Sequence, residues 1–271
     1  MTITPTLLTP RAVRQACRDG SWNYPSTAGI CEGYVQANLV ILPSKYADDF
    51  RNLCARNPVP CPLLGETKKG DPTIPSHLAA DCDIRTDAPL YRIYKGGKLV
   101  EEKKDILAEW DDDDSVGFLI GCSFSFEAAL INGGLTPRQI EIGRNVPMYR
   151  TKAPLAPAGR LGGHMVVSMR PYPPEAIEQV RDLTRPFIRT HGEPIAWGAE
   201  GAAALGIDDP EGKNPDFGDA SEIREGEVPV YWGCGVTPQL SVMDSKIPEI
   251  VCGHSPGHML LLDIRDEDVC Q

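Results

Sequence analysis

The sequence lacks the patterns that assign a chain to several common classes of protein. Its nine cysteines form no CxxC pair, so neither a zinc ribbon nor a thioredoxin-type redox site is expected. It contains neither GxGxxG nor GxxxxGK[ST], the glycine-rich loops that bind nucleotide phosphates. No apolar run reaches the length of a membrane span, and the opening residues MTITPTLLTP do not read as a secretory signal. Together with unpaired thiols, these absences predict a cytoplasmic protein with no membrane partner.

Positive charge is also scarce. There are 27 Lys and Arg residues against 38 Asp and Glu residues, which gives a formal net charge of -11. The densest charge run is acidic, at residues 111–114. An acidic protein repels phosphate backbones, so no nucleic-acid partner is expected. An anionic ligand would therefore need a local pocket that contains arginine.

What is present is a mixture of helix and strand patterns over 271 residues. Thr9 and Pro10 form a helix start signal, and Gly96 with Gly97 predicts a hairpin over residues 91–100. Expected helices span residues 10–18, 44–56, 125–131 and 173–189, and expected strands span 116–124, 165–169, 228–232, 250–252 and 259–264. The apolar run within residues 33–43 is compatible with a strand or a buried loop. Strands mixed with helices favour an α/β fold.

Residues 121–127 follow an apolar strand and precede a helix. Backbone N–H groups at such a turn face ligand anions, because a helix N-terminus carries partial positive charge. Cys122 is a candidate nucleophile there, since a helix start favours thiolate. Ser123 and Ser125 are candidate substrate-binding residues. Alternatively, a serine caps the helix and Cys122 is a buried packing residue.

Two further segments place arginine where it could bind a carboxylate. Arg144 and Arg150 lie in a proline-broken loop over residues 143–151, and guanidinium groups suit bidentate carboxylate recognition. His164 and Arg170 flank the expected strand 165–169 and are also candidate substrate-binding residues. Surface arginines and a structural histidine are the alternatives.

The C-terminal part is dense in glycine, cysteine, histidine and carboxylates. Its candidate residues are Asp216, Glu227, Cys234, His254 and His258. Cys234 lies between two glycines, so the backbone there can approach a ligand closely, and it is a candidate substrate-binding residue. Alternatively, the histidines hydrogen-bond to turn carbonyls.

The His-x3-His spacing of His254 and His258 is interrupted by proline and glycine, so the two do not share a helical face. With Asp216, Asp219 or Asp263 they could still hold a divalent cation such as Mn²⁺ or Mg²⁺. The metal ligands themselves stay unassigned.

Together these segments resemble the D-glutamate cyclase family, whose bacterial members are catalogued as hydro-lyases. The matching blocks are GYVQANLVILP, DIRTDAPLYRIYKGG, SVGFLIGCSFSFEAALINGG, RNVPMYRT, GGHMVVSMRP, PDFGD, GEVPVYWGCGVTPQ and HSPGHMLLLD. They follow the family's order and extend over nearly the whole chain.

The resemblance implies a three-layer α/β sandwich packed against a smaller two-layer α+β subdomain. We expect the larger part to comprise approximately residues 1–140 and 200–271, and the smaller part residues 141–199, within one compact unit. It also implies loss of water from a small acid, with D-glutamate converted to 5-oxo-D-proline. The formation of a homodimer is an alternative that the sequence leaves open.

One block departs from the family pattern. A pattern like HGAPVHIGDP is expected, but residues 191–200 read HGEPIAWGAE, with Ala196 in place of the second histidine. If this stretch touches substrate, the substrate here could differ from D-glutamate.

A dehydration of this kind needs a carboxylate clamp, proton transfer and stabilisation of a tetrahedral centre. Arg144 or Arg150 would hold the carboxylate, and the backbone around residues 122–123 would stabilise the oxyanion. Proton transfer would use one or more of His254, His258, Glu227 and Asp216. The alternatives are a hydro-lyase for another small carboxylic acid and a protein that binds a small carboxylate without turnover.

Overall fold

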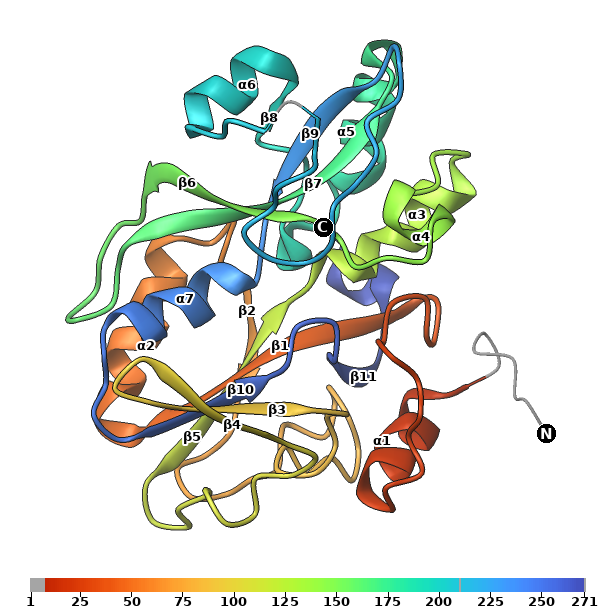
Figure 1. The fold of residues 1–271 in the computed structure, drawn as a ribbon. Helices are drawn as coiled ribbons and strands as arrows, with labels where there is room; N and C mark the ends of the chain where they lie inside the picture. Colours follow the sequence, from red (N-terminus) through yellow and green to blue (C-terminus); the bar gives the residue numbers. More distant parts are fainter. Residues whose placement is uncertain (1–7, 210, 271) are drawn as a thin grey trace.

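The computed structural model describes residues 8–209 and 211–270. It shows two parts, one above the other in Figure 1, each built on an antiparallel sheet. The larger sheet contains β1 (Tyr34–Pro43), β2 (Leu63–Glu66), β3 (Tyr91–Lys95), β4 (Lys98–Lys103), β5 (Ser115–Gly121), β10 (Ile250–His254) and β11 (Leu260–Arg265). Its strand order is β2-β5-β1-β10-β3-β4, and β11 also pairs with β1.

The smaller sheet contains β6 (Met148–Pro154), β7 (His164–Tyr172), β8 (Ala196–Trp197) and β9 (Val228–Gly233). Its order is β6-β7-β9-β8. Strand β9 therefore lies in the smaller sheet, although the expected boundaries put residues 200–271 with the larger part. The chain enters the smaller sheet after β5, leaves it after β9, and then returns to the larger sheet.

Seven α-helices surround the two sheets in the described part of the chain. They are α1 (Pro10–Arg18), α2 (Ala47–Arg56), α3 (Glu127–Asn132), α4 (Arg138–Glu141), α5 (Ile177–Thr184), α6 (Gly198–Leu205) and α7 (Val236–Asp244). Short 3-10 turns are η2 (Ser44–Tyr46), η3 (Ser123–Phe126), η4 (Pro174–Ala176), η5 (Ile188–Thr190) and η6 (Asp266–Val269). This mixture of helices and strands confirms the α/β class. The strand pairs of both sheets are antiparallel.

The central strand β1 is buried on both faces, and alternate residues supply two hydrophobic clusters. Val40 and Leu42 pack with residues of α2 and α7. Leu39 and Ile41 pack on the opposite face with the irregular segment 74–88 and with residues of the smaller part. The larger sheet is therefore the middle of three layers, and its core continues into the smaller sheet.

Most of the expected elements are present, with shifted boundaries. Thr9 caps α1 by accepting a hydrogen bond from Ala12 N at 3.2 Å, as the helix signal predicts. The expected helix over residues 173–189 is found as η4, α5 and η5, and α5 ends at Thr184 because Pro186 cannot continue a helix. The run at 33–43 forms β1, which resolves the choice between strand and buried loop.

Candidate functional site

A cavity of about 580 Å³ lies where loops from both parts of the molecule meet. Its volume is in the range of sites for small ligands. The wall comes from the loop before β1, from α4 and the turn that follows it, from the segment before β9, and from the turn between β10 and β11. The polar or closely packed lining residues used below are Ser26, Gln139, Arg144, Asn145, Asp219 and Gly257.

Two distant loops are held together beside this cavity by Thr27 and Gly257. Thr27 N donates to Gly257 O at 2.7 Å, and Met259 N donates to Thr27 Oγ1 at 3.0 Å. Gly257 has a φ of 78°, in the left-handed region that favours glycine. A Cβ there would lie 3.6 Å from Ser26 Cβ and 3.5 Å from Asn145 Nδ2. These are ordinary contact distances, so the left-handed backbone of the HSPGH segment, and not a lack of space, favours glycine here.

Charges of both signs line this cavity. Arg144 Nη1 donates to the Ala220 carbonyl at 2.9 Å, which fixes one end of an otherwise exposed guanidinium. Asp219 Oδ2 accepts from Asn145 N at 2.8 Å. Asn145 Oδ1 accepts from Val146 N at 2.9 Å. An anionic group can bind Arg144, and a cationic group can bind Asp219.

A buried polar network lies behind the cavity, centred on the ion pair between Arg170 and Glu127. Arg170 is 0% exposed and donates from Nη2 to Glu127 Oε1 at 2.5 Å. Nη2 also donates to Ser123 Oγ at 3.0 Å, and Nη1 donates to Ser168 Oγ at 3.1 Å. Gln139 Nε2 donates to the same Glu127 oxygen at 2.7 Å.

This network changes the interpretation of two predicted substrate-binding residues. Arg170 and Ser123 are buried and bonded to each other, and neither lines the cavity. The aromatic rings of Phe126 and Trp232 cover the Arg170 guanidinium, at 5.1 and 5.4 Å from their centroids. Arg170 is placed to position Glu127, and direct contact with a ligand in the cavity is not available to it here.

The predicted nucleophile Cys122 follows β5 and is buried. Burial raises the pKa of its thiol above the usual value, so the thiol is the stable form. The expectation that a helix start would favour thiolate is wrong, because η3 has only four residues and desolvation dominates. Burial likewise raises the pKa of Cys234, to about 11.

Ser125 is buried on η3 and its Oγ accepts from Gln36 N at 3.2 Å. The same hydroxyl also interacts with Asp266, where burial raises the carboxyl pKa to about 7. Ser125 therefore links η3 to β1 and η6, and it lies outside the cavity lining.

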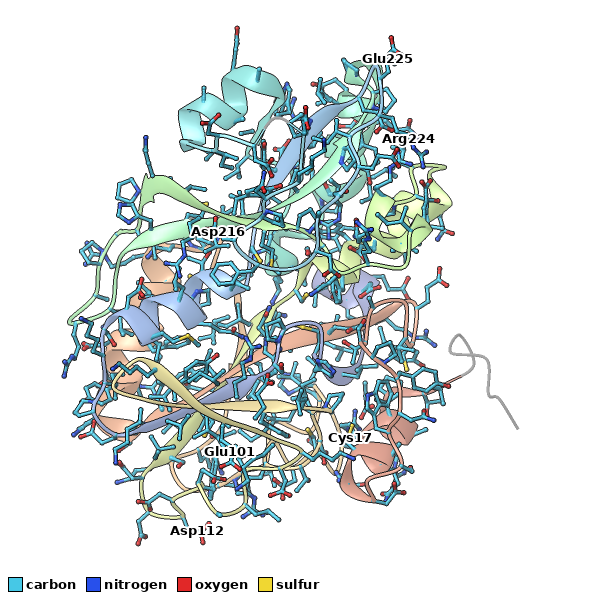
Figure 2. All side chains as sticks on the ribbon, in the orientation of Figure 1. Cys17, Glu101, Asp112, Asp216, Arg224 and Glu225 are labelled. Atoms are coloured by element: carbon cyan, nitrogen blue, oxygen red, sulfur yellow. The ribbon has the colours of Figure 1, made fainter. Side chains whose placement is uncertain are left out.

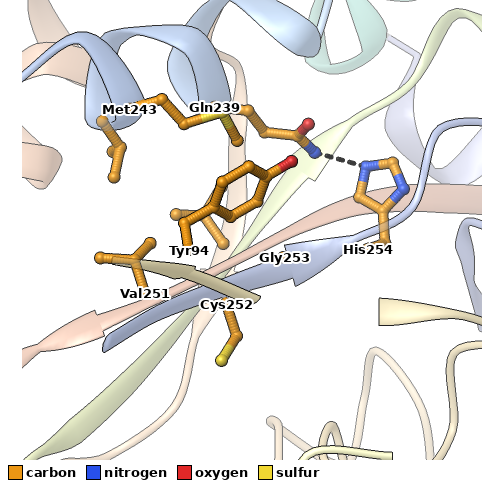
Figure 3. A pocket seen from close by; sticks show the side chains of 9 residues that line it. Tyr94, Gln239, Met243, Val251, Cys252, Gly253 and His254 are labelled. Atoms are coloured by element: carbon orange, nitrogen blue, oxygen red, sulfur yellow. Dashed lines mark hydrogen bonds between the residues drawn. The ribbon is translucent and has the colours of Figure 1, made fainter. Parts of the chain in front are cut away.

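His254 ends β10 and faces a closed space (Figure 3). That space holds about 10 Å³, which is too small for a substrate. Gln239 Nε2 donates to His254 Nε2 at 2.5 Å, and Asn38 Oδ1 lies 3.1 Å from the same nitrogen. His254 Nδ1 donates to Ser255 O at 2.8 Å. Burial lowers the pKa of His254 to about 4, so its imidazole is neutral at pH 7.

The remaining predicted residues are spread over the molecule. His258 is half-buried, with Nδ1 3.0 Å from Pro256 O, as the turn-carbonyl alternative predicts. Glu227 forms an ion pair with Arg138. It also accepts a hydrogen bond from the backbone N–H of Arg224, which Figure 2 labels. Asp216, also labelled in Figure 2, accepts from Arg150 N at 2.8 Å.

Arg150 and His164 also lie away from the cavity lining. The Arg150 guanidinium stacks over Phe217, 5.2 Å from the ring centroid. His164 is exposed at the start of β7, whereas Arg170 lies near the other end of the same strand. Of the residues predicted to be catalytic or substrate-binding, Arg144 is the one that lines the cavity.

The described residues contain no group of three or more His, Cys, Asp or Glu side chains arranged to hold a metal ion. Asp263, one of the expected ligands, is bound by both terminal nitrogens of Arg14, at 3.0 and 2.9 Å. Asp216 and Asp219 each accept a backbone N–H. These carboxylates and His254 do not form one ligand set, so we derive no step through a metal.

The departing block, residues 191–200, lies outside the cavity lining. Several of its residues line a separate cavity of about 530 Å³ near α5. Ala196 pairs with Tyr231 at the β8–β9 edge. The departure therefore alters an edge of the smaller sheet and the wall of this second cavity, and no residue of the first cavity's lining.

Sequence reasoning missed Gln139, Ser26 and Gly257 as residues of this wall, and it considered Asp219 only as a metal ligand. Gln139 belongs to a four-residue helix, which is too short for a periodic signal. The resemblance blocks did contain Asn145, Asp219 and Gly257, so their order along the chain carried part of the signal.

The two-sheet fold and the charged cavity between the parts define an α/β protein with a cavity of the size that small ligands fill. A family model described as D-glutamate cyclase matches residues 116–263. "Putative hydro-lyase YcsI" of Bacillus subtilis is 54% identical over 262 residues, 97% of this chain and 99% of that protein. "Putative hydro-lyase C5H10.01" of Schizosaccharomyces pombe is 54% identical over 241 residues, 88% of this chain and 79% of that protein. The chain belongs to the D-glutamate cyclase family.

Within residues 8–209 and 211–270, no helix combines the length and the apolar character that a membrane span requires.

Proposed function

We propose that this protein is a hydro-lyase that removes water from a small amino- or hydroxy-carboxylate, with D-glutamate as substrate and 5-oxo-D-proline as product. The observation that supports it best is the pairing of Arg144 and Asp219 on the wall of one cavity. An α-amino acid carries one carboxylate and one ammonium group, and these two side chains complement both. The names of the relatives and the family agree with this chemistry.

In the proposed reaction Arg144 holds the α-carboxylate of D-glutamate. Asp219 holds the ammonium group and takes a proton from it, which frees the nitrogen lone pair. The nitrogen attacks the side-chain carboxyl carbon, so a C–N bond forms and a tetrahedral centre results. The nitrogen loses a second proton as the amide forms, and both protons, the first of them carried by Asp219, pass to one oxygen of the former carboxylate. The C–O bond to that oxygen then breaks, and the oxygen leaves as water. Donors on the wall, such as the Asn145 amide, stabilise the negative oxygen.

We also propose a cytoplasmic location for the enzyme. All nine cysteines are free thiols and eight of them are buried, which suits a reducing compartment.

Turnover of a panel of acids tests this function. The purified protein is incubated with D-glutamate, L-glutamate and small hydroxy- and amino-dicarboxylates, each with EDTA and with added Mn²⁺ or Mg²⁺. Loss of one water from D-glutamate supports the proposal. Turnover of another acid alone favours a different hydro-lyase, and thermal stabilisation without turnover favours a carboxylate-binding protein.

A further inference from the structure

We propose that Gln139 selects ligands that carry an amine at this cavity, because its amide carbonyl accepts the ligand N–H in an orientation set by Glu127 and Arg170. This rests on the proposed function, which assigns the cavity to a small carboxylate. It names the residue by which the cavity would distinguish an amino acid from a dicarboxylate of the same length that has no amine.

The orientation of the Gln139 amide follows from its neighbours. Glu127 Oε1 accepts from Arg170 at Nη2 and also at Nε, 3.2 Å away, so this oxygen acts as an acceptor. The group of Gln139 that faces it at 2.7 Å must therefore be the NH₂ donor. A flipped amide would place two acceptor oxygens against each other. Because Arg170 is buried and fully engaged, it holds Glu127 in this role.

The carbonyl end of the same amide has no partner. Gln139 is 2% exposed and lines the cavity, and its Oε1 is buried without a hydrogen bond among the described residues. A buried acceptor without a donor is unfavourable, so a donor from a ligand is a natural partner. The oxygen is covered in this structure, and the proposal therefore includes a small shift of the short helix α4 when ligand binds.

The sign of the surrounding charge favours an ammonium group over a hydroxyl group. Asp219 lines the same cavity, so the wall to which Gln139 belongs also carries a carboxylate. An ammonium group offers three N–H donors and a positive charge, whereas a hydroxyl offers one donor and no charge.

The test compares two ligands and three proteins by isothermal titration calorimetry. D-glutamate carries two carboxylates and an amine, and glutarate carries the same two carboxylates without a donor. The proteins are the wild type, Gln139→Met and the control Gln179→Met. Gln179 is an exposed glutamine on α5 that donates to Gly133 O and lies outside the cavity lining. Thermal unfolding checks that each variant is folded, and Gln139→Asn is the second variant if Gln139→Met is not.

We expect Gln139→Met to weaken D-glutamate binding about tenfold, and to leave glutarate within about twofold of the wild type. The control should change neither value. Equal loss for both ligands, or no loss for D-glutamate, would overturn the role of Gln139 while leaving the proposed function intact. If the wild type binds neither ligand, both proposals fail.

Discussion

Asn145 donates its backbone N–H to the Asp219 carboxylate at 2.8 Å, although the two residues are 74 positions apart in the sequence. This bond joins the turn after α4 to the segment before β9, and both segments line the cavity. Arg144 precedes Asn145, and its guanidinium donates to the carbonyl of Ala220, the residue after Asp219. The charged wall therefore depends on an approach of two loops that local sequence patterns do not encode.

Arg144→Met should weaken substrate binding more than it slows the chemical step. The variant keeps an extended side chain but loses the charge-assisted hydrogen bonds to the carboxylate, so KM should rise about 10- to 100-fold. Steady-state kinetics with D-glutamate measures this. Arg150→Met is the matched control, because Arg150 follows six residues later, in β6 and not in the loop expected from the sequence, and its guanidinium lies over Phe217, outside the cavity lining. A KM equal to that of the control would contradict the clamp assignment.

Asp219→Asn should lower kcat by about 10²-fold or more, because the proposed base is lost. The amide oxygen can still accept the Asn145 N–H, so the loop contact is retained. Asp216→Asn is the matched control, since Asp216 also accepts a backbone N–H but does not line the cavity. If both variants keep wild-type kcat, Asp219 is not the base.

Breaking the Arg170–Glu127 pair should destabilise the fold. Arg170→Met leaves Glu127 buried and uncompensated, and loss of one partner of a buried pair costs about 3–5 kcal/mol. The double variant Arg170→Met with Glu127→Gln should be less destabilised than the sum of the single variants. Urea unfolding of the wild type and the three variants gives the change in the free energy of unfolding for each variant. If the change in the double variant equals the sum of the two single changes, the pair is not coupled.

His254 should stay neutral well below the usual pKa of histidine. Burial lowers its pKa to about 4 in the folded protein, against about 6.5 when unfolded. The folded protein then binds fewer protons than the unfolded chain between these values. Its contribution to stability is therefore fully present above about pH 6.5 and is lost as the pH falls toward 4.

Nitrogen chemical shifts from a ¹⁵N-histidine-labelled sample give the direct check on His254. They should report a neutral ring with Nδ1 protonated at pH 5.5, because Nδ1 donates to Ser255 O. A ring that titrates near pH 6.5 would show that His254 is accessible to water, and would return it to the candidates for proton transfer.

Much of the fold could be predicted from the sequence, because it depends on local patterns. The Thr9 cap, the apolar run of β5 and the Gly96–Gly97 turn each specify an element within a few residues. The assignment of β9 to the smaller sheet could not be predicted in this way. It depends on pairing between β7 and β9, which lie far apart along the chain.

The site was less predictable for the same reason. Arginine, histidine and cysteine were favoured by residue type, but burial decides which of them a ligand can reach. Arg170, His254 and Cys122 are all buried, and contacts between elements far apart in the sequence make them so. Arg144 and Asp219 are exposed loop residues without a periodic signal, and their proximity results from the Asn145 hydrogen bond.

The central claim is tested most directly by the fate of D-glutamate with the wild-type protein and Asp219→Asn side by side. The product is followed by mass spectrometry for the loss of one water, with chiral separation of 5-oxoproline. The account predicts that the wild type forms 5-oxo-D-proline and that Asp219→Asn forms it at least about 10²-fold more slowly. Formation at the uncatalysed rate by the wild type, with or without Mn²⁺ or Mg²⁺, would contradict it.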